Sequence, residues 1–330
     1  MSPAVASGYR PPRWLRNPHL QSVLAGSLLR RRHGRSALAA IGARTRQVIV
    51  DGGEGVRLLG LHTALPDVEP RGMALLLHGW EGSAESAYVC LATADFLARG
   101  YDVFRLNFRD HGDTHHLNPD IFHSARIDEV VHAALDVSRR MPRPRLVVAG
   151  HSLGGNFALR LALRASAAGL PLDGVAAVCP VLDPARTMDA MEQGFPLYMQ
   201  HFERSWRRSL ARKRELFPER LAFEDAVLRL RMRDLTEWLV MRHTDFGSLD
   251  AYFDRYSIAG DRLAALTVPA SILTSADDPV IPVADFHQLT LPAQARLEVA
   301  RWGGHCGFLE GPWLGGYAER WVAAQLAGDD

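Results

Sequence analysis

Short apolar runs alternate along this chain with segments that have the apolar spacing of helices, and this alternation limits the fold more than any other feature. The predicted helices between the runs are Ala87–Arg99, Ile127–Arg140 and Asn156–Ala167. Uninterrupted apolar strands separated by helices indicate a mostly parallel sheet buried on both faces. We therefore predict an α/β fold with a central sheet of about eight strands and flanking helices. The predicted strands are Thr45–Asp51, Val56–His62, Met73–Leu77, Tyr101–Leu106, Leu146–Ala149, Val175–Cys179, Ala270–Leu273 and Leu297–Ala300.

One segment, residues 184–258, interrupts the alternation because it has several helical patterns and no convincing strand. Inserted between two strands of a parallel sheet, it would form a helical cap over the carboxyl edge; ordinary flanking helices are the alternative. Its many aromatic side chains are expected to form the interior of the cap more often than a substrate wall. The predicted organisation is a basic arm at 1–44, core segments at 45–183 and 259–330, and the cap at 184–258.

Composition excludes several classes of protein. Hydrophobic residues make up 47% and charged residues 23% of the 330 residues, which is typical of a globular protein and not of a disordered chain. No apolar run reaches the roughly 18 residues of a membrane-spanning helix, and no secretory signal is evident. Cys90, Cys179 and Cys306 are far apart and form no CxxC pair. This argues against a structural zinc or a disulfide framework and favours a cytoplasmic location.

The first 50 residues contain nine arginines and no acidic residue. Such an arm can contact nucleic acid or an anionic membrane. Interleaved aromatic residues and a nucleic-acid-binding motif are both missing, so we predict no nucleic-acid partner. We expect the arm to pack against the core or the cap, and a peripheral membrane contact is the alternative.

The most informative motif is the stretch from Leu146 to Asn156, in which an apolar strand, a G-x-S-x-G pattern and a helix follow one another. The sharp turn forces the central Ser152 into a strained conformation and leaves no room for side chains at Gly150 and Gly154. It lifts the Ser152 hydroxyl above the sheet edge, where the first amides of the helix point toward developing negative charge. We predict that Ser152 is a catalytic nucleophile.

A serine nucleophile at neutral pH needs a base that a third group orients. In this architecture the chain order is serine, acid, histidine. His305, flanked by glycines after the last predicted strand, is the predicted base. Two carboxylates end an earlier strand, and similarity to the usual pattern of such serine enzymes, in which the acid directly precedes the proline of a D-P-x-x-P turn, favours Asp278 as the acid. Asp277 is the second candidate, and its other expected role is to stabilise the turn.

Two backbone amides are needed to bind the oxyanion of an acyl-transfer intermediate. The amide of Leu153, which follows the nucleophile, is predicted to supply the first. The amide of Trp80, in the loop after the Met73–Leu77 strand, is predicted to supply the second. We expect His78 in the same loop to brace it through hydrogen bonds.

A further cluster, Asp110-His111-Gly112-Asp113-Thr114-His115-His116, holds three histidines and two aspartates. Its spacing is not that of a zinc hydrolase, and no second cluster completes it. We expect a hydrogen-bonded loop beside the active site. We expect no metal and no cofactor for the protein as a whole.

These motifs together resemble the α/β-hydrolase superfamily and, within it, the YheT-type branch of hydrolases and esterases. The mark of that branch is Asn17-Pro18-His19-Leu20-Gln21-Ser22, which is similar to the family's N-P-H-L-Q-T. His151, where many relatives have Phe, and Arg109–Gly112 depart from the family pattern and leave substrate preference open. The resemblance covers roughly residues 12–315 and rests on Gly150–Asn156, His78-Gly79, Asp277–Pro279 and Gly303–His305.

The resemblance implies a Ser-Asp-His hydrolase under a cap. We expect it to cleave a small-molecule carboxylic ester, with an apolar or lipid-like acyl group, through an acyl-enzyme. The lipid character comes from animal relatives alone and is an analogy. Acyl transfer to an alcohol or thiol by the same three residues is one alternative. A non-catalytic binding protein on the same scaffold is the other, and the complete set of three residues argues against it.

Overall fold

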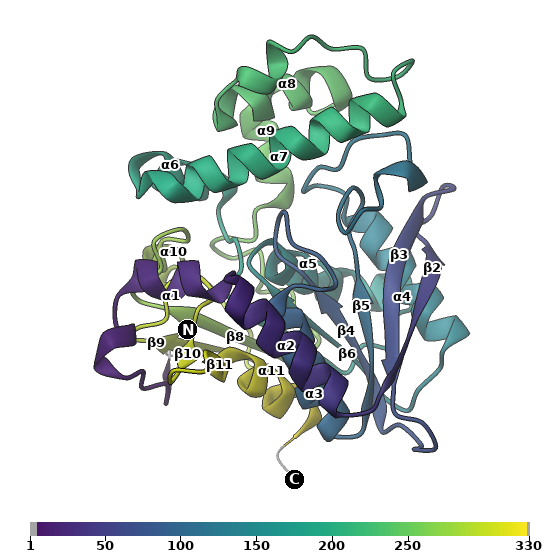
Figure 1. The fold of residues 1–330 in the computed structure, drawn as a ribbon, viewed down its shortest axis with the longest axis vertical. Helices are drawn as coiled ribbons and strands as arrows, with labels where there is room; N and C mark the ends of the chain where they lie inside the picture. Colours follow the sequence, from purple (N-terminus) through teal and green to yellow (C-terminus); the bar gives the residue numbers. More distant parts are fainter. Residues whose placement is uncertain (1–4, 329–330) are drawn as a thin grey trace.

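A nine-stranded sheet forms the centre of the computed structural model, which describes residues 5–328 (Figure 1). Its strands are β1 (Val5–Ala6), β2 (Arg44–Asp51), β3 (Arg57–Ala64), β4 (Gly72–Leu77), β5 (Tyr101–Leu106), β6 (Leu146–His151), β7 (Gly174–Val178), β8 (Ala270–Ser275) and β9 (Ala295–Ala300). They lie in the order β1-β9-β8-β7-β6-β4-β5-β3-β2. Neighbours are parallel from β1 to β5 and antiparallel at β5–β3 and β3–β2. A separate short hairpin pairs β10 (Leu309–Glu310) with β11 (Gly315–Gly316).

The mostly parallel α/β sheet predicted from the sequence is confirmed. All eight predicted strands are present, with ends that shift by at most two residues. The ninth strand, β1, was not predicted because two residues carry no periodic pattern. It lies in the N-terminal arm and extends the sheet beyond β9, with Val5 opposite Glu298.

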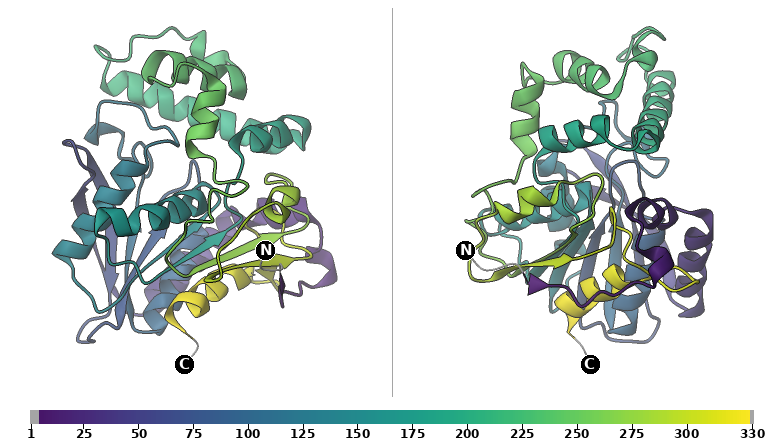
Figure 2. Two further views of the ribbon diagram at one scale, coloured as in Figure 1. Left: turned by 180° about the vertical axis from the view of Figure 1, so that it is seen from behind. Right: turned by 90° about the vertical axis from the view of Figure 1, so that its left-hand side faces the viewer.

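Helices cover both faces of the sheet because the strand side chains alternate between two apolar layers. Met73 and Leu75 of β4 belong to the layer under α4 and α5, whereas Ala74 and Leu76 belong to the layer under α3 and α11. The view from behind shows α5 across the face opposite the arm (Figure 2, left). The flanking helices are α3 (Ala87–Ala98), α4 (Ile127–Arg140), α5 (Leu153–Ala168), α10 (Val283–His287) and α11 (Tyr317–Ala327).

Residues 184–258 form a helical layer over the carboxyl edge of the parallel strands, at the top of Figure 1. The first helix begins at Pro184, and the Asp183 side chain accepts a hydrogen bond from the Arg186 amide as its N-cap. Within residues 5–328, no helix has both the length and the apolar character needed to cross a lipid bilayer. The elements of the cap are α6 (Pro184–Gln193), α7 (Pro196–Leu216), the 3-10 turn η3 (Val227–Arg229), α8 (Met232–His243) and α9 (Leu249–Tyr256).

The N-terminal arm packs along one side of the core, where α2 lies against α3 (Figures 1 and 2). The buried Arg30 of α2 donates a hydrogen bond of 2.5 Å to Glu319 of α11, so one arginine of the basic arm neutralises a buried carboxylate of the core. Residues 1–4 of the predicted arm lie outside the described residues. The described elements of the arm, besides β1, are η1 (Arg13–Leu15), α1 (Pro18–Ala25) and α2 (Leu28–Ala40).

Candidate active site

Ser152 occupies the turn between β6 and α5 with φ 54° and ψ −120°, a conformation that costs free energy for any residue other than glycine. A Cβ atom at Gly150 would lie 2.1 Å from the carbonyl oxygen of Gly154. A Cβ atom at Gly154 would lie 2.3 Å from the carbonyl oxygen of Leu77. The two glycines therefore allow the close approach that the turn requires, as the sequence predicts, and the turn holds Ser152 at the carboxyl edge of the sheet.

His305 and Asp278 lie next to Ser152 on loops after β9 and β8. The Nε2 atom of His305 is 2.9 Å from Ser152 Oγ, and its Nδ1 atom is 2.9 Å from Asp278 Oδ2. The other oxygen of Asp278 accepts hydrogen bonds from the amides of Val280 (2.8 Å) and Ile281 (2.9 Å). These two bonds fix the carboxylate, so Nδ1 carries the proton and Nε2 is free to accept the proton of the serine.

Asp277, the second candidate acid, points elsewhere. Its Oδ1 atom accepts a hydrogen bond of 2.9 Å from the amide of Gly304, which places it under the histidine loop. Burial raises the pKa of Asp277, and its Oδ2 atom has no hydrogen-bond partner within residues 5–328. The structure thus pairs Asp278 with the imidazole and Asp277 with the backbone that carries it.

The carboxylate of Asp278 dominates the electrostatics of His305. Burial by itself lowers the pKa of the imidazole, but the charge of Asp278, the neighbouring Cys306 and the hydrogen bonds to them raise it well above its usual value. The Asp278 side chain is fully buried and that of His305 is 12% exposed, so little solvent screens the pair. The buried carboxylate therefore stabilises the imidazolium that forms when His305 takes up a proton.

Two backbone amides beside Ser152 are available to a ligand. Within residues 5–328, the amides of Trp80 and Leu153 have no hydrogen-bond acceptor. The neighbours of Trp80 are held: the Gly79 amide donates to Tyr88 Oη at 2.8 Å, and the Glu81 amide donates to His111 Nε2 at 3.2 Å. Trp80 and Leu153, the two predicted oxyanion donors, thus lie on one braced loop and at the first turn of α5.

Buried histidines brace the loops around the site. His78 donates from Nδ1 to the Gly79 carbonyl at 2.7 Å, and its Nε2 accepts from the Phe108 amide at 3.2 Å. His111 donates from Nδ1 to the Arg109 carbonyl at 2.7 Å and accepts from Glu81. Burial lowers the pKa of His78 well below its usual value and that of His111 to about 4, so both rings stay neutral.

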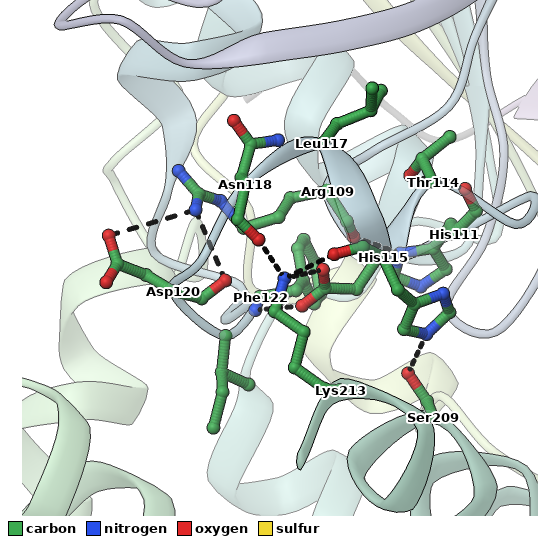
Figure 3. A network of polar contacts seen from close by, with 12 residues as sticks. Arg109, His111, Thr114, His115, Leu117, Asn118, Asp120, Phe122, Ser209 and Lys213 are labelled. Atoms are coloured by element: carbon green, nitrogen blue, oxygen red, sulfur yellow. Dashed lines mark hydrogen bonds and ion pairs between the residues drawn. The ribbon is translucent and has the colours of Figure 1, made fainter. Parts of the chain in front are cut away.

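The loop that carries the predicted histidine cluster lies between β5 and α4 and contacts α7 of the cap (Figure 3). His115, in the short turn η2 (His115–Leu117), bonds through Nε2 to Ser209 of α7 at 2.8 Å. Lys213 of α7 donates to Asp110 Oδ1 at 2.5 Å and to the His115 carbonyl at 3.1 Å, and it also donates to the Asn118 carbonyl. The hydrogen-bonded loop expected from the sequence is present, and its partner is the cap.

Lys213 is the only lysine in the chain, and sequence reasoning assigned it no role. Its side chain is 1% exposed and that of Asp110 is 4% exposed. Burial lowers the pKa of Lys213 and raises that of Asp110, while each partner favours the charge of the other. The two side chains therefore form a buried ion pair that links α7 of the cap to the core.

The N-terminal arm positions the histidine loop, a second role that the sequence analysis missed. Ser22 Oγ accepts a hydrogen bond of 2.8 Å from the His305 amide and donates to the Pro18 carbonyl at 2.7 Å. The buried Gln21 accepts from the Leu309 amide at 2.8 Å, just beyond the same loop. The Asn17–Ser22 motif contains both residues and carries the family resemblance, but the sequence alone does not show that it contacts the histidine loop.

An apolar cavity of about 820 Å³, its open mouth included, lies between the cap and the sheet edge, and Ser152 and His305 form part of its wall. Trp80 stacks on Phe202 of α7 at 5.3 Å between ring centroids, which joins the core wall to the cap wall. Several predicted cap aromatics therefore do line a pocket as well as pack within the cap. The cap residues of the wall include Met188, Met191, Phe202, Trp206, Met232, Leu239, Tyr252, Phe253 and Tyr256.

The fold, the cap and the strained serine turn together define the class of α/β hydrolases. A model of the alpha/beta hydrolase fold matches residues 75–312, and the chain belongs to this family. It is 25% identical over 260 residues to "Putative esterase YheT" of Escherichia coli (strain K12), covering 76% of this chain and 74% of that protein. The match agrees with the YheT-type resemblance in the sequence.

Solved structures of low sequence identity share the fold. A hyperthermophilic esterase from the archaeon Pyrobaculum calidifontis superposes with a TM-score of 0.60 at 18% identity, covering 96% of each chain. The 2,6-dihydroxy-pseudo-oxynicotine hydrolase superposes with a TM-score of 0.58 at 18% identity, covering 90% of this chain and 72% of that one. The esterase Pf2001 of Pyrococcus furiosus gives 0.52 at 14% identity, with 81% and 86% covered.

Proposed function

We propose that this protein is a serine hydrolase that cleaves carboxylic esters with an apolar acyl group. The observation that carries the proposal is the continuous hydrogen-bonded chain from Ser152 through His305 to Asp278, which opens into an apolar cavity. Membership of the alpha/beta hydrolase family supports hydrolysis in general. The names of the relative from Escherichia coli and of the archaeal structures support an ester as the bond that is cleaved.

The reaction begins when Ser152 Oγ attacks the ester carbonyl and His305 Nε2 accepts the hydroxyl proton. The Asp278 carboxylate keeps Nδ1 protonated and stabilises the imidazolium that forms. His305 then returns the proton to the departing alkoxide, which leaves as an alcohol, and an acyl-Ser152 ester remains. A water molecule, deprotonated by the same Nε2, attacks this ester, and the carboxylic acid and free Ser152 result.

The negative charge of each tetrahedral intermediate develops on the former carbonyl oxygen. The free amides of Trp80 and Leu153 would donate to it, and the positive end of the α5 dipole adds to the stabilisation. Because neighbouring bonds already hold the Trp80 loop, these donors need little reorganisation when the charge appears. Removing one such donor typically lowers kcat by 10²–10³-fold.

The apolar lining of the cavity is evidence that the enzyme prefers esters with an apolar acyl group. Its cap wall consists largely of methionine, leucine and aromatic side chains. Each Å² of apolar substrate surface that is buried against this wall contributes about 25 cal/mol of favourable free energy. A charged acyl chain would lose its hydration there without gaining a partner. We therefore expect turnover to rise with acyl length until the chain fills the cavity.

Hydrolysis of p-nitrophenyl esters from acetate to palmitate tests the proposal. Ser152→Ala should lower kcat by several orders of magnitude. Ser124→Ala, which removes another serine hydroxyl from the cavity wall, should retain most of the activity. Wild-type turnover in the Ser152→Ala protein would overturn the proposal. Ester formation with an added alcohol, at the expense of free acid, would instead identify an acyltransferase that uses the same three residues.

A further inference from the structure

Two thiols lie beside the imidazole of the catalytic site. Cys179 directly follows β7 and Cys306 directly follows His305. Their Sγ atoms and a ring nitrogen of His305 all lie within 4.8 Å of one another, and Cys306 Sγ is 4.0 Å from His305 Nε2. Within residues 5–328, no other group of three His, Cys, Asp or Glu side chains has the spacing of a metal site. The sequence argued against a zinc site because these cysteines are far apart along the chain.

The backbone holds both thiols in place. Cys179 has φ 43° and Cys306 has φ 54°, so both occupy the left-handed region that non-glycine residues rarely adopt. Besides each other and His305, the sulfurs contact two carbonyls at long distances: Cys179 that of Gly304 at 4.0 Å and Cys306 that of Val178 at 3.7 Å. Strained conformations of this kind persist where the surrounding structure enforces them, and they concentrate at functional sites. The sulfur lone pairs are therefore positioned without being used in strong hydrogen bonds.

The donor set matches the chemistry of zinc. Zn–S and Zn–N bonds of about 2.3 and 2.0 Å place the ligand atoms of a tetrahedral site about 3.5–3.8 Å apart. The present spacing needs to contract by only about 1 Å to reach that geometry. Asp278 already binds the opposite ring nitrogen of His305 at 2.9 Å, which is the carboxylate–histidine arrangement that supports metal ligands in proteins. Two thiols also exclude Mg²⁺ and Ca²⁺, which require oxygen ligands.

We propose that Cys179, Cys306 and His305 form an inhibitory binding site for Zn²⁺. Binding forms two Zn–S bonds and one Zn–N bond at Nε2, and it releases the two thiol protons to solvent. Water or Ser152 Oγ fills the fourth position. Because the Nε2 lone pair then coordinates the metal, it cannot accept the proton of Ser152, and hydrolysis stops. The inhibition rests on the proposed hydrolase function, whereas the binding does not.

The binding itself can be measured with Co²⁺, a spectroscopic substitute for Zn²⁺. Titration of the reduced protein with CoCl₂ should produce a thiolate-to-cobalt charge-transfer band that Zn²⁺ abolishes. Ser152→Ala should show the same band, because the hydroxyl is not required for binding. In parallel, buffered free Zn²⁺ should reduce the rate of ester hydrolysis by the wild type, and a chelator should restore it.

Cys179→Ala and Cys90→Ala form a matched pair of variants, because both remove a buried thiol and only the first removes a ligand. Cys179→Ala should lose the band and need more than about 100-fold more free Zn²⁺ for half-inhibition, since the loss of a supporting partner alone costs 10–100-fold in affinity. Cys90→Ala should behave as the wild type. An unchanged Co²⁺ band in Cys179→Ala, or no band in the wild type, would overturn the proposal even if the protein proves to be an esterase.

Discussion

The side chains in the two walls of the cavity are held in place by different kinds of interaction. On the sheet side, polar atoms are held one by one: Ser152 by its strained turn, Asp278 by two backbone amides and His305 by Asp278 and Ser22. On the cap side, the wall consists largely of methionine and aromatic side chains that are held mainly by packing, such as Phe202 against Trp80 of the core.

This difference separates the groups that carry out the reaction from those that set the preference among esters. Directional hydrogen bonds lose their effect when an atom moves by about 1 Å, whereas apolar packing tolerates changes of shape at a modest cost. Changes in the sheet wall should therefore alter kcat for every ester, and changes in the cap wall should alter the ranking of esters. The Lys213–Asp110 ion pair joins the walls, so its loss should affect stability first.

The largest effect is expected at the acid. Asp278→Asn should lower kcat by about 10⁴-fold, because an amide in place of the carboxylate no longer fixes the tautomer or stabilises the imidazolium. Asp277→Asn should cost far less, since its amide oxygen can still accept from the Gly304 amide. Steady-state kinetics on one short ester would compare the two variants. Equal losses would mean that the two carboxylates share the role of the acid.

The next largest effect is expected at the ion pair between core and cap. Lys213→Met should lower the free energy of unfolding by about 3–5 kcal/mol, because it leaves the buried Asp110 without its cation. The neighbouring Arg212 pairs with Asp113 at an exposed site, so Arg212→Met should cost about 1 kcal/mol or less. Urea denaturation measures both. Similar small losses would show that the buried pair does not hold the cap.

A smaller effect is expected in the cap wall. Met188→Ala, which deepens the cavity, should raise the preference for long over short acyl chains by about tenfold while kcat on acetate changes little. Met141→Ala, at an equally buried methionine away from the cavity, controls for the loss of core packing. If kcat of Met188→Ala fell by the same factor for every ester, the cap wall would not act on substrate preference separately from the sheet wall.

The smallest effect is a dependence of stability on pH. Burial raises the pKa of Glu81 to about 7, although Arg208 of the cap opposes this shift. A group with a raised folded-state pKa binds its proton more tightly in the native state. Its contribution to stability is therefore complete below its ordinary pKa and is lost as the pH rises through about 7. Glu81→Gln should flatten the fall of Tm across this range, with Glu85→Gln as the control for the loss of one charge.

The sequence could predict which groups of the sheet wall lie close together because each of them belongs to a local backbone pattern. The glycine turn located Ser152, the glycines around position 305 located the histidine, and the D-P turn separated Asp278 from Asp277. The contacts that were missed join segments that are remote along the chain. Ser22 meets His305, Lys213 meets Asp110 and Cys179 meets Cys306 only after the arm, the cap and the strand ends have come together.

We expect the sheet wall to hold an activated Ser152 whatever lies in the cavity. Reaction with a fluorophosphonate, in which Ser152 Oγ displaces fluoride from phosphorus, tests it directly when mass spectrometry locates the modified residue. We expect a single phosphonylated serine, Ser152, in the wild type and in Met188→Ala, and none in Ser152→Ala. Modification of a different residue, or no modification of the wild type by a short-chain probe, would contradict it.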